Sequence, residues 1–238
     1  MSLISIYRAY GGELEQKDFK PFRPSFFNKF KAWSSFYREF KDNKIIVVWD
    51  GDTNNELYSY ISKFPVEIVL NEVPGNIPSL LKCYDIAEKE NFEFIYCVED
   101  DYIHLEGGNQ ILLDMFRFSP LVSLCDYQDR YRYPNDDVTF GQDYIIQGNF
   151  PNTYRTAEST TMTFGIKRDF LIREREIINF YVKKGDGAPA DRELFRHYIT
   201  KGIRLVTPIG KDSKAAHLVL GTMNKMVDWE KEMNWTSI

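Results

Sequence analysis

Apolar runs typical of buried strands alternate with helical segments through the first part of this chain. The strand-like runs are residues 3–10, 45–49, 66–70 and 94–98, and the helical segments between them are residues 24–40, 55–64 and 78–90. Parallel strands are joined by crossover connections, which are usually helices. The alternation therefore predicts a single α/β domain with a mostly parallel central sheet and helices on both faces.

Aromatic residues recur at helical spacing in the segment 24–40. They are Phe26, Phe30, Trp33, Tyr37 and Phe40. This stripe predicts the buried face of an amphipathic helix, so we assign it to the core and give it no chemistry. In the segment 78–90 a loop containing Asn76 precedes the helix, and Asn76 is a candidate N-cap residue.

Three consecutive carboxylates follow the fourth strand, at Glu99, Asp100 and Asp101. Adjacent acids raise one another's pKa unless a cation lies among them. In an extended backbone Glu99 and Asp101 point to one side and Asp100 to the other, so two oxygens could hold a divalent cation while the third acid binds a ligand. The alternative is a solvated acidic turn, because charged clusters usually lie at the surface.

Other charged side chains are expected near the same edge of the sheet. Arg8 ends the first strand and Asp50 ends the second, and ligands of open α/β sheets bind at the carboxyl ends of strands. Arg8 is equally consistent with a surface cation. Lys82, in the first turns of the third helix, is positioned either to reach a phosphate or to face solvent.

The second half of the chain has less regular patterning. Residues 110–118, 168–183, 191–201 and 224–235 are expected to form helices, and residues 121–124, 160–166 and 203–206 to form strands. Residues 126–156 are polar, rich in tyrosine and without clear periodicity, which is typical of functional or mobile segments. Asp191 is a candidate N-cap residue, and His217 lies among small residues.

The composition excludes some classes of function. A net charge of −5 and a pI near 5.4 argue against a nucleic-acid-binding protein. Three widely spaced cysteines favour a reducing compartment and show no metal-ligand spacing. No apolar run approaches the ~18 residues of a membrane span, so we expect a soluble, cytoplasmic protein. The sequence leaves the oligomeric state open.

From the first strand to His217, the order of these motifs resembles the GT-A fold of nucleotide-sugar-dependent glycosyltransferases. Residues 98–102 (VEDDY) are similar to the DXD motif, although Glu99 replaces the first Asp, and residues 50–54 (DGDTN) are similar to the Asp-Gly-Ser-type turn. Residues 190–193 (ADRE) match the place of the late acidic motif. The size is also similar to that of small soluble viral or bacterial members, which implies the host cytoplasm for a viral protein.

The resemblance implies a role for each matching residue. The expected metal ligands are Glu99, Asp101 and His217, which favour Mn²⁺ or Mg²⁺. The expected contacts to a nucleotide-sugar donor are Arg8, Asp50, Lys82 and Asp100. Asp191 would deprotonate the acceptor hydroxyl and make the reaction inverting, with Glu193 as the other candidate. Residues 1–105 would bind the donor, with a UDP-sugar favoured, and residues 106–238 a glycan or glycoprotein acceptor.

Two other functions remain open. A sugar-nucleotide nucleotidyltransferase shares this layered design, but its phosphate loop after the first strand is normally basic, whereas residues 11–15 are GGELE. A non-catalytic sugar- or nucleotide-binding module would bind without turnover. The irregular segment is our candidate for acceptor contacts on aromatic content alone, through Tyr127, Tyr131, Tyr133 and Tyr144.

Overall fold

A nine-stranded mixed sheet forms the centre of the computed structural model, which describes residues 2–14, 21–128, 145–147, 152–158 and 160–235. The strand order is β3-β2-β1-β4-β9-β6-β10-β8-β7. The strands are β1 (Leu3–Tyr10), β2 (Lys44–Asp50), β3 (Glu67–Leu70), β4 (Phe94–Glu99), β6 (Leu121–Val122), β7 (Ile145–Gln147), β8 (Thr153–Ala157), β9 (Phe164–Lys167) and β10 (Leu205–Pro208). The β3-β2-β1-β4 half is parallel, and β9 and β8 run antiparallel to their neighbours.

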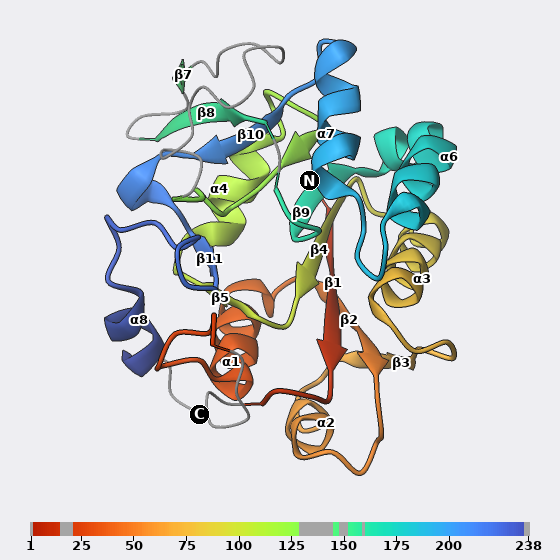
Figure 1. Cartoon of the computed structure of the whole chain (residues 1–238), viewed down its shortest axis with the longest axis vertical. Helices are drawn as coiled ribbons and strands as arrows, with labels where there is room; N and C mark the ends of the chain where they lie inside the picture. The colour runs from red at the N-terminus through yellow and green to blue at the C-terminus, as the bar shows by residue number, and fades with distance from the viewer. Residues whose placement is uncertain (1, 15–20, 129–144, 148–151, 159, 236–238) are drawn as a thin grey trace.

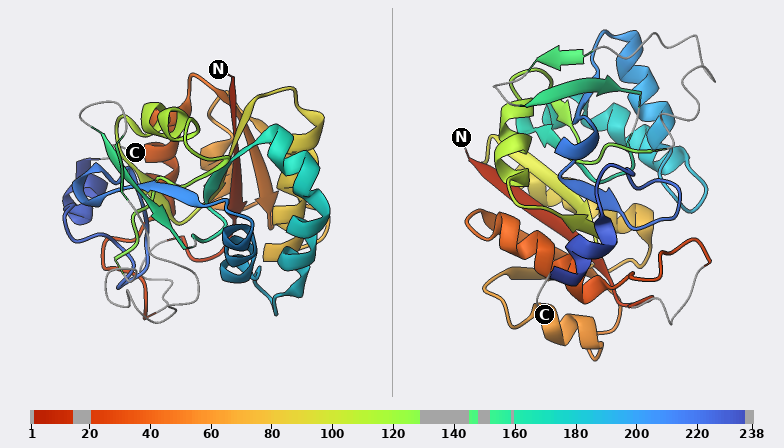
Figure 2. Two further views of the ribbon diagram at one scale, coloured as in Figure 1. Left: turned by 90° about the horizontal axis from the view of Figure 1, so that it is seen from above. Right: turned by 90° about the vertical axis from the view of Figure 1, so that its left-hand side faces the viewer.

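Helices cover both faces of this sheet, as the two views of Figure 2 show. One face packs against α1 (Lys29–Phe40), α2 (Glu56–Ile61) and α4 (Gly108–Met115), and the other against α3 (Asn76–Lys89), α6 (Arg168–Lys184) and α7 (Asp191–Thr200). Alternate residues of β1 enter the two cores: Tyr7 one and Ile6 the other. Because both faces are buried, the central strands are apolar along their length.

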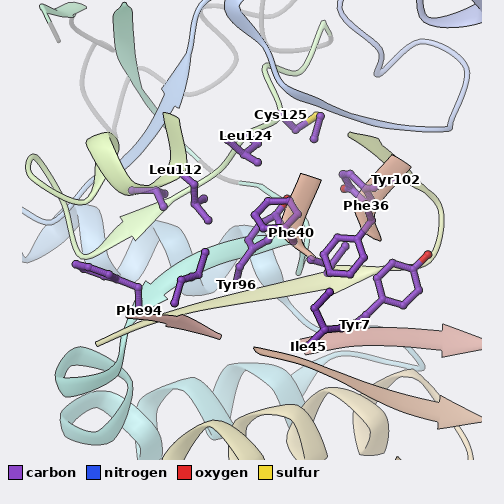
Figure 3. Close-up of a cluster of buried hydrophobic side chains, with 14 of the residues drawn as sticks. Tyr7, Phe36, Phe40, Ile45, Phe94, Tyr96, Tyr102, Leu112, Leu124 and Cys125 are labelled. Carbon is purple, nitrogen blue, oxygen red and sulfur yellow. The ribbon is translucent and has the colours of Figure 1, made fainter. Parts of the chain in front are cut away.

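The predicted aromatic stripe is confirmed in part. Trp33 and Phe40 are fully buried, Phe30 and Tyr37 are half-buried against the same core, and Phe26 lies before the helix. Phe36, which the prediction did not include, is also fully buried. The Phe40 ring lies 5.1 Å from that of Tyr96 on β4, and the Trp33 ring meets Tyr7 edge-on at 4.9 Å. Figure 3 shows Phe36, Phe40, Tyr7 and Tyr96 of this cluster against the strands of the sheet. Offset and edge-to-face ring pairs add to the free energy of burial and fix α1 against β1 and β4.

A second, two-stranded sheet joins the acidic turn to the C-terminal part of the chain. β5 (Tyr102–His104) pairs antiparallel with β11 (Ala215–His217), which places His217 opposite Tyr102. The helix α8 (Trp229–Trp235) packs beside them through the buried side chains of Trp229 and Met233. This pairing brings β11 beside the strand that follows the three acids, although the two strands are more than one hundred residues apart in the sequence (Figure 1).

The α/β fold class is confirmed, and several predicted element ends are wrong. The first helix begins at Lys29 and not at residue 24, because the Asn28 side chain accepts the Lys31 N–H and caps it there. Three later elements also start later than predicted: β9 at Phe164, β10 at Leu205 and α8 at Trp229. The local amino-acid sequence predicts that a helix or strand is present more reliably than it predicts the residues at which that element begins and ends.

Both predicted N-cap residues are wrong. Gly75 caps α3, with φ +125°, and Asn76 is the first helical residue. The Asn76 side chain instead accepts a hydrogen bond from Arg8. Ala190 occupies the cap position of α7, and Asp191 is again the first helical residue. The Asn76 oxygen thus bonds outside its own helix, whereas Asp191 Oδ1 accepts the N–H of Arg192, the next residue of α7.

Candidate functional site

A pocket of about 530 Å³ opens at the carboxyl ends of β1, β2 and β4. Its walls include residues 8–10 of β1, Asp50 of β2, residues 74–76 and Ser79 at the start of α3, and residues 99–101 after β4. These strands are parallel and adjacent, so their carboxyl ends meet at one edge of the sheet (Figure 1). The fold therefore collects the polar ends of three strands around a single pocket.

Arg8 lies at the bottom of this pocket, 6 % exposed. Its Nη2 donates to Glu99 Oε1 at 2.6 Å, since the two residues are register partners in β1 and β4. Its Nη1 donates to the carbonyl and the side-chain oxygen of Asn76 at 3.0 and 2.7 Å. The guanidinium thus ties the first turn of α3 to the acidic turn, and the surface alternative for Arg8 is wrong.

Asp50 and Tyr10 form another wall of the pocket. Asp50 is 8 % exposed, and its Oδ2 accepts the Gly75 N–H at 2.8 Å, which fixes the loop before α3. Tyr10 is 56 % exposed although it is the last residue of a buried strand. Its ring lies directly over Gly12, where a Cβ atom would come within 2.4 Å of the Tyr10 ring carbon Cε1. Gly12 therefore leaves room for an aromatic ring exposed at the rim of the pocket.

Asp100 is paired with a buried lysine. Its Oδ2 accepts from the Tyr10 N–H at 2.6 Å and from Lys29 Nζ at 2.8 Å. Lys29 is 2 % exposed and also donates to the carbonyls of Tyr10 and Gly12 at 2.9 and 2.7 Å. Burial raises the pKa of Asp100, and the ammonium of Lys29 opposes this shift. The pair holds the exposed end of β1 in place.

Asp101 carries two basic partners on one oxygen. Its Oδ2 accepts from Arg23 Nη1 at 2.8 Å and lies 3.1 Å from His217 Nε2. Burial by itself would raise the pKa of Asp101, but His217 and Arg23 outweigh it and hold that pKa well below its usual range. Burial by itself would lower the pKa of His217. The Asp101 carboxylate outweighs burial and raises the pKa of His217 above its usual value.

A network of buried hydroxyls supports the histidine. The Tyr102 ring stacks on the His217 ring, with centroids 4.8 Å apart and planes 2° from parallel. The Tyr102 hydroxyl lies 2.5 Å from that of Tyr127 and bonds to Thr161. Thr163 accepts the Glu99 N–H at 2.9 Å. Residues 160–163 thus help to position both ends of the acidic turn.

Asp101 and His217 fit a divalent cation, and Glu99 as placed here does not join them. Among the described residues, Asp101 Oδ1 is buried and has no hydrogen-bond partner, and a buried unpaired carboxylate oxygen is costly unless a ligand satisfies it. Glu99 is held by Arg8 and Thr163. Across the described residues no group of three Asp, Glu, His or Cys side chains converges as a metal site. Any cation there would need further ligands from a bound molecule.

Four predicted residues lie outside the pocket wall: Lys82, Asp191, Glu193 and His217. Lys82 is half-buried on α3. Asp191 and Glu193 occupy the first turn of α7, where Glu193 pairs with Lys184 and Asp191 accepts the Arg192 N–H. The site thus combines Arg8, Asp50 and the three acids in one pocket, with His217 beside Asp101.

The acceptor-contact prediction is wrong for Tyr127, which is 6 % exposed and bonded within the hydroxyl network. Tyr131, Tyr133 and Tyr144 lie outside the described residues.

Sequence reasoning missed Lys29, Arg23, Asn76 and Ser79. Lys29 had a usable signal, because it lies four positions before Trp33 on the apolar side of α1. A lysine on such a stripe needs a buried partner. Arg23 had no comparable signal, since it lies in an irregular stretch before α1 and its partner is 78 positions away.

No protein-family model matches the sequence, and no curated protein matches it. Solved structures do share the fold, at sequence identities that support nothing beyond the fold. S. aureus TarS 1–349 in complex with UDP-GlcNAc aligns with a TM-score of 0.52 and 12 % identity, over 92 % of this chain and 60 % of TarS 1–349.

Two synthases align over nearly their whole length. One is 4-diphosphocytidyl-2C-methyl-D-erythritol synthase from Anaerococcus prevotii, with a TM-score of 0.51, 10 % identity and coverage of 99 % of this chain and 94 % of that one. The other is CMP:2-keto-3-deoxy-manno-octonic acid synthetase complexed with CTP, with a TM-score of 0.50, 11 % identity and coverage of 98 % of both chains. The chain thus has the Rossmann-like fold of these proteins, as the sequence predicted. Among the described helices, none is both long and apolar enough to cross a membrane.

Proposed function

We propose that this chain is a metal-dependent glycosyltransferase that moves a sugar from a nucleoside diphosphate sugar to an acceptor hydroxyl, with a UDP-sugar as donor. One observation carries the proposal. A single pocket joins Arg8, Asp50 and the turn 99–101, and Asp101 in that turn lies 3.1 Å from His217. A structure of the same fold, TarS 1–349, holds the nucleotide sugar UDP-GlcNAc.

The rim of the pocket suits a nucleobase. The Tyr10 ring is exposed and offers a face for stacking, which is worth about 1–3 kcal/mol per base. Asp50 is a hydrogen-bond acceptor in the same wall, and a carboxylate selects bases that present an N–H. Uracil offers N3–H to such an acceptor, but cytosine offers its N4 amino group and guanine its N1–H. Asp50 is therefore a base contact, and the choice of UDP as the nucleotide rests on the resemblance to nucleotide-sugar-dependent glycosyltransferases.

The part of the pocket lined by Asp101, with His217 next to it, suits a diphosphate with its metal. Asp101 and His217 would hold Mn²⁺ or Mg²⁺, with Mn²⁺ favoured by the imidazole. When bound, such an ion stabilises the negative charge that grows on the departing diphosphate. Tyr102 keeps the His217 ring in its orientation by stacking on it. Asp100 and Lys29 fix the strand end on which the Tyr10 ring is mounted.

Asp191 is the residue that we propose as general base. The Glu193 carboxylate forms an ion pair with Lys184, which makes it the weaker candidate. Asp191 is half-buried at the first turn of α7, where the helix dipole stabilises a carboxylate. General base catalysis by a positioned carboxylate contributes about 10²–10⁴-fold to the rate. A single base of this kind gives inversion at the anomeric carbon.

Calorimetric titration tests this proposal. UDP, GDP and CMP are each added with Mn²⁺ and with a chelator. We expect UDP to bind in the presence of Mn²⁺ and to bind at least about tenfold more weakly with the chelator. Folded protein that binds none of the three nucleotides would contradict the proposed glycosyltransferase and favour a non-catalytic module.

A second candidate is a nucleotidyltransferase, which the full-length alignment with the CTP-bound synthetase favours. Such an enzyme binds a nucleoside triphosphate and releases pyrophosphate. Titration with CTP and UTP separates the two functions. A triphosphate that binds more tightly than its diphosphate, together with pyrophosphate release on adding sugar phosphates, would favour the nucleotidyltransferase. Hydrolysis of a UDP-sugar to UDP in the absence of acceptor would favour the glycosyltransferase.

A further inference from the structure

Each of the three consecutive acids has its own basic partner within the protein. Glu99 pairs with Arg8 at 2.6 Å, Asp100 with Lys29 at 2.8 Å and Asp101 with Arg23 at 2.8 Å. The three cations come from β1, from the start of α1 and from the segment before α1. The turn therefore has far less net negative charge than its sequence implies.

Arg23 is the partner that touches Asp101, the carboxylate proposed above as a metal ligand. Its side chain is 10 % exposed, and Nη1 donates to Asp101 Oδ2 and, at 3.1 Å, to the Leu218 carbonyl. Its guanidinium lies 4.6 Å from the Phe27 ring centroid, and Nη2 is 3.6 Å from Glu13 Oε2. These contacts hold the positive charge in place beside Asp101.

A divalent cation on Asp101 and His217 would lie close to this charge. Two positive charges a few ångströms apart repel, and low exposure of the site weakens the screening by solvent. A nucleoside diphosphate supplies negative oxygens that attract both cations at once. The repulsion therefore weakens the binding of a cation that arrives alone. It has a much smaller effect on the binding of a cation that arrives with a diphosphate.

We propose that Arg23 is a positioning residue that keeps the affinity of Asp101 and His217 for a free divalent cation low, so that the cation and the diphosphate bind cooperatively. This inference rests on the proposed function. By linkage, the factor by which UDP tightens Mn²⁺ binding equals the factor by which Mn²⁺ tightens UDP binding. Arg23 raises that factor by weakening the binding of Mn²⁺ alone.

The test measures Mn²⁺ affinity by the electron paramagnetic resonance signal of free Mn²⁺, with and without UDP, and requires no turnover. We expect Arg23→Gln to tighten binding of Mn²⁺ alone by about tenfold or more and to reduce the enhancement by UDP. Arg23→Lys keeps the charge and should stay close to the wild type. Arg117→Gln is the control, because Arg117 is 52 % exposed and pairs with Asp114 on α4.

An Arg23→Gln variant that binds Mn²⁺ alone no more tightly than the wild type would overturn the inference. So would an Arg23→Lys variant that matches Arg23→Gln, because charge would then not be the cause. If Arg23→Gln does not fold, the inference is tested by the Mn²⁺ affinity of Arg23→Lys and of the wild-type protein, each with and without UDP. If UDP does not tighten Mn²⁺ binding in the wild-type protein, the cooperativity is refuted. Failure of UDP to bind under any condition would instead refute the proposed function.

Discussion

The buried pair of Lys29 and Asp100 gives the sharpest test of how the site is built. Lys29→Met keeps the length of the side chain and removes its charge. The variant leaves Asp100 buried, with the Tyr10 N–H as its remaining hydrogen-bond donor among the described residues, and removes the donor to the Tyr10 and Gly12 carbonyls. Removal of one partner from a buried ion pair costs about 3–5 kcal/mol, because the other charge stays buried without compensation.

Urea unfolding followed by circular dichroism at neutral pH measures this cost. We expect Lys29→Met to lower the free energy of unfolding by about 3–5 kcal/mol. The double variant Lys29→Met/Asp100→Asn should lose less than Lys29→Met alone, because it leaves no buried charge. Lys44→Met is the matched control: its ion pair with Glu90 is at the surface, and such pairs contribute about 0–1 kcal/mol.

The same variant has a defined pH dependence. Burial already raises the pKa of Asp100 in the folded protein, and the loss of Lys29 raises it further. A carboxyl with a folded pKa above its unfolded pKa takes up protons on folding, so its penalty grows as the pH rises above the unfolded value near 4. The stability gap between Lys29→Met and wild type should therefore be smaller at pH 5 than at pH 8. A gap under about 1 kcal/mol at neutral pH, or one that grows at acid pH, would refute this account of the pair.

Further predictions concern the other parts of the site. Asp101→Ala should abolish the metal-dependent component of UDP binding, and calorimetry that shows unchanged affinity with Mn²⁺ would exclude Asp101 as a ligand. Tyr10→Ala should weaken UDP binding by about 1–3 kcal/mol if the ring stacks on the base. Asp191→Asn should keep UDP binding and lose transfer, whereas transfer lost only in Glu193→Gln would identify Glu193 as the base. Burial lowers the pKa of His104 to about 3, so stability should fall as the pH drops from about 6.5, and His104→Gln should flatten that profile in urea unfolding.

The fold class followed from the sequence because each signal for it was local. The run at residues 94–98 is apolar along its whole length, and such a run in water would be unfavourable unless both faces were covered. The spacing of Trp33 and its neighbours selected a helix in the same way. The ends of elements did not follow, because the start of α1 is set by one side-chain contact, in which Asn28 accepts the Lys31 N–H.

The site followed from the sequence only in part. The positions of Arg8, Asp50 and the three acids at strand ends predicted that they would share one edge of the sheet, and the pocket confirms it. The acids' partners could not be predicted in this way. Glu99 and Arg8 are 91 residues apart, and Asp100 and Lys29 are 71 apart, so only tertiary structure brings each pair together.

These pairings change what three adjacent acids imply. In the sequence, the repulsion among them was itself an argument for a bound divalent cation. In the folded protein, Arg8, Lys29 and Arg23 already offset that repulsion, so the turn is stable without one. Two observations still favour a cation. Among the described residues, Asp101 Oδ1 is buried and has no hydrogen-bond partner, and His217 lies next to this carboxylate. A metal requirement here therefore depends on one carboxylate and one imidazole, together with the charge of whatever binds in the pocket.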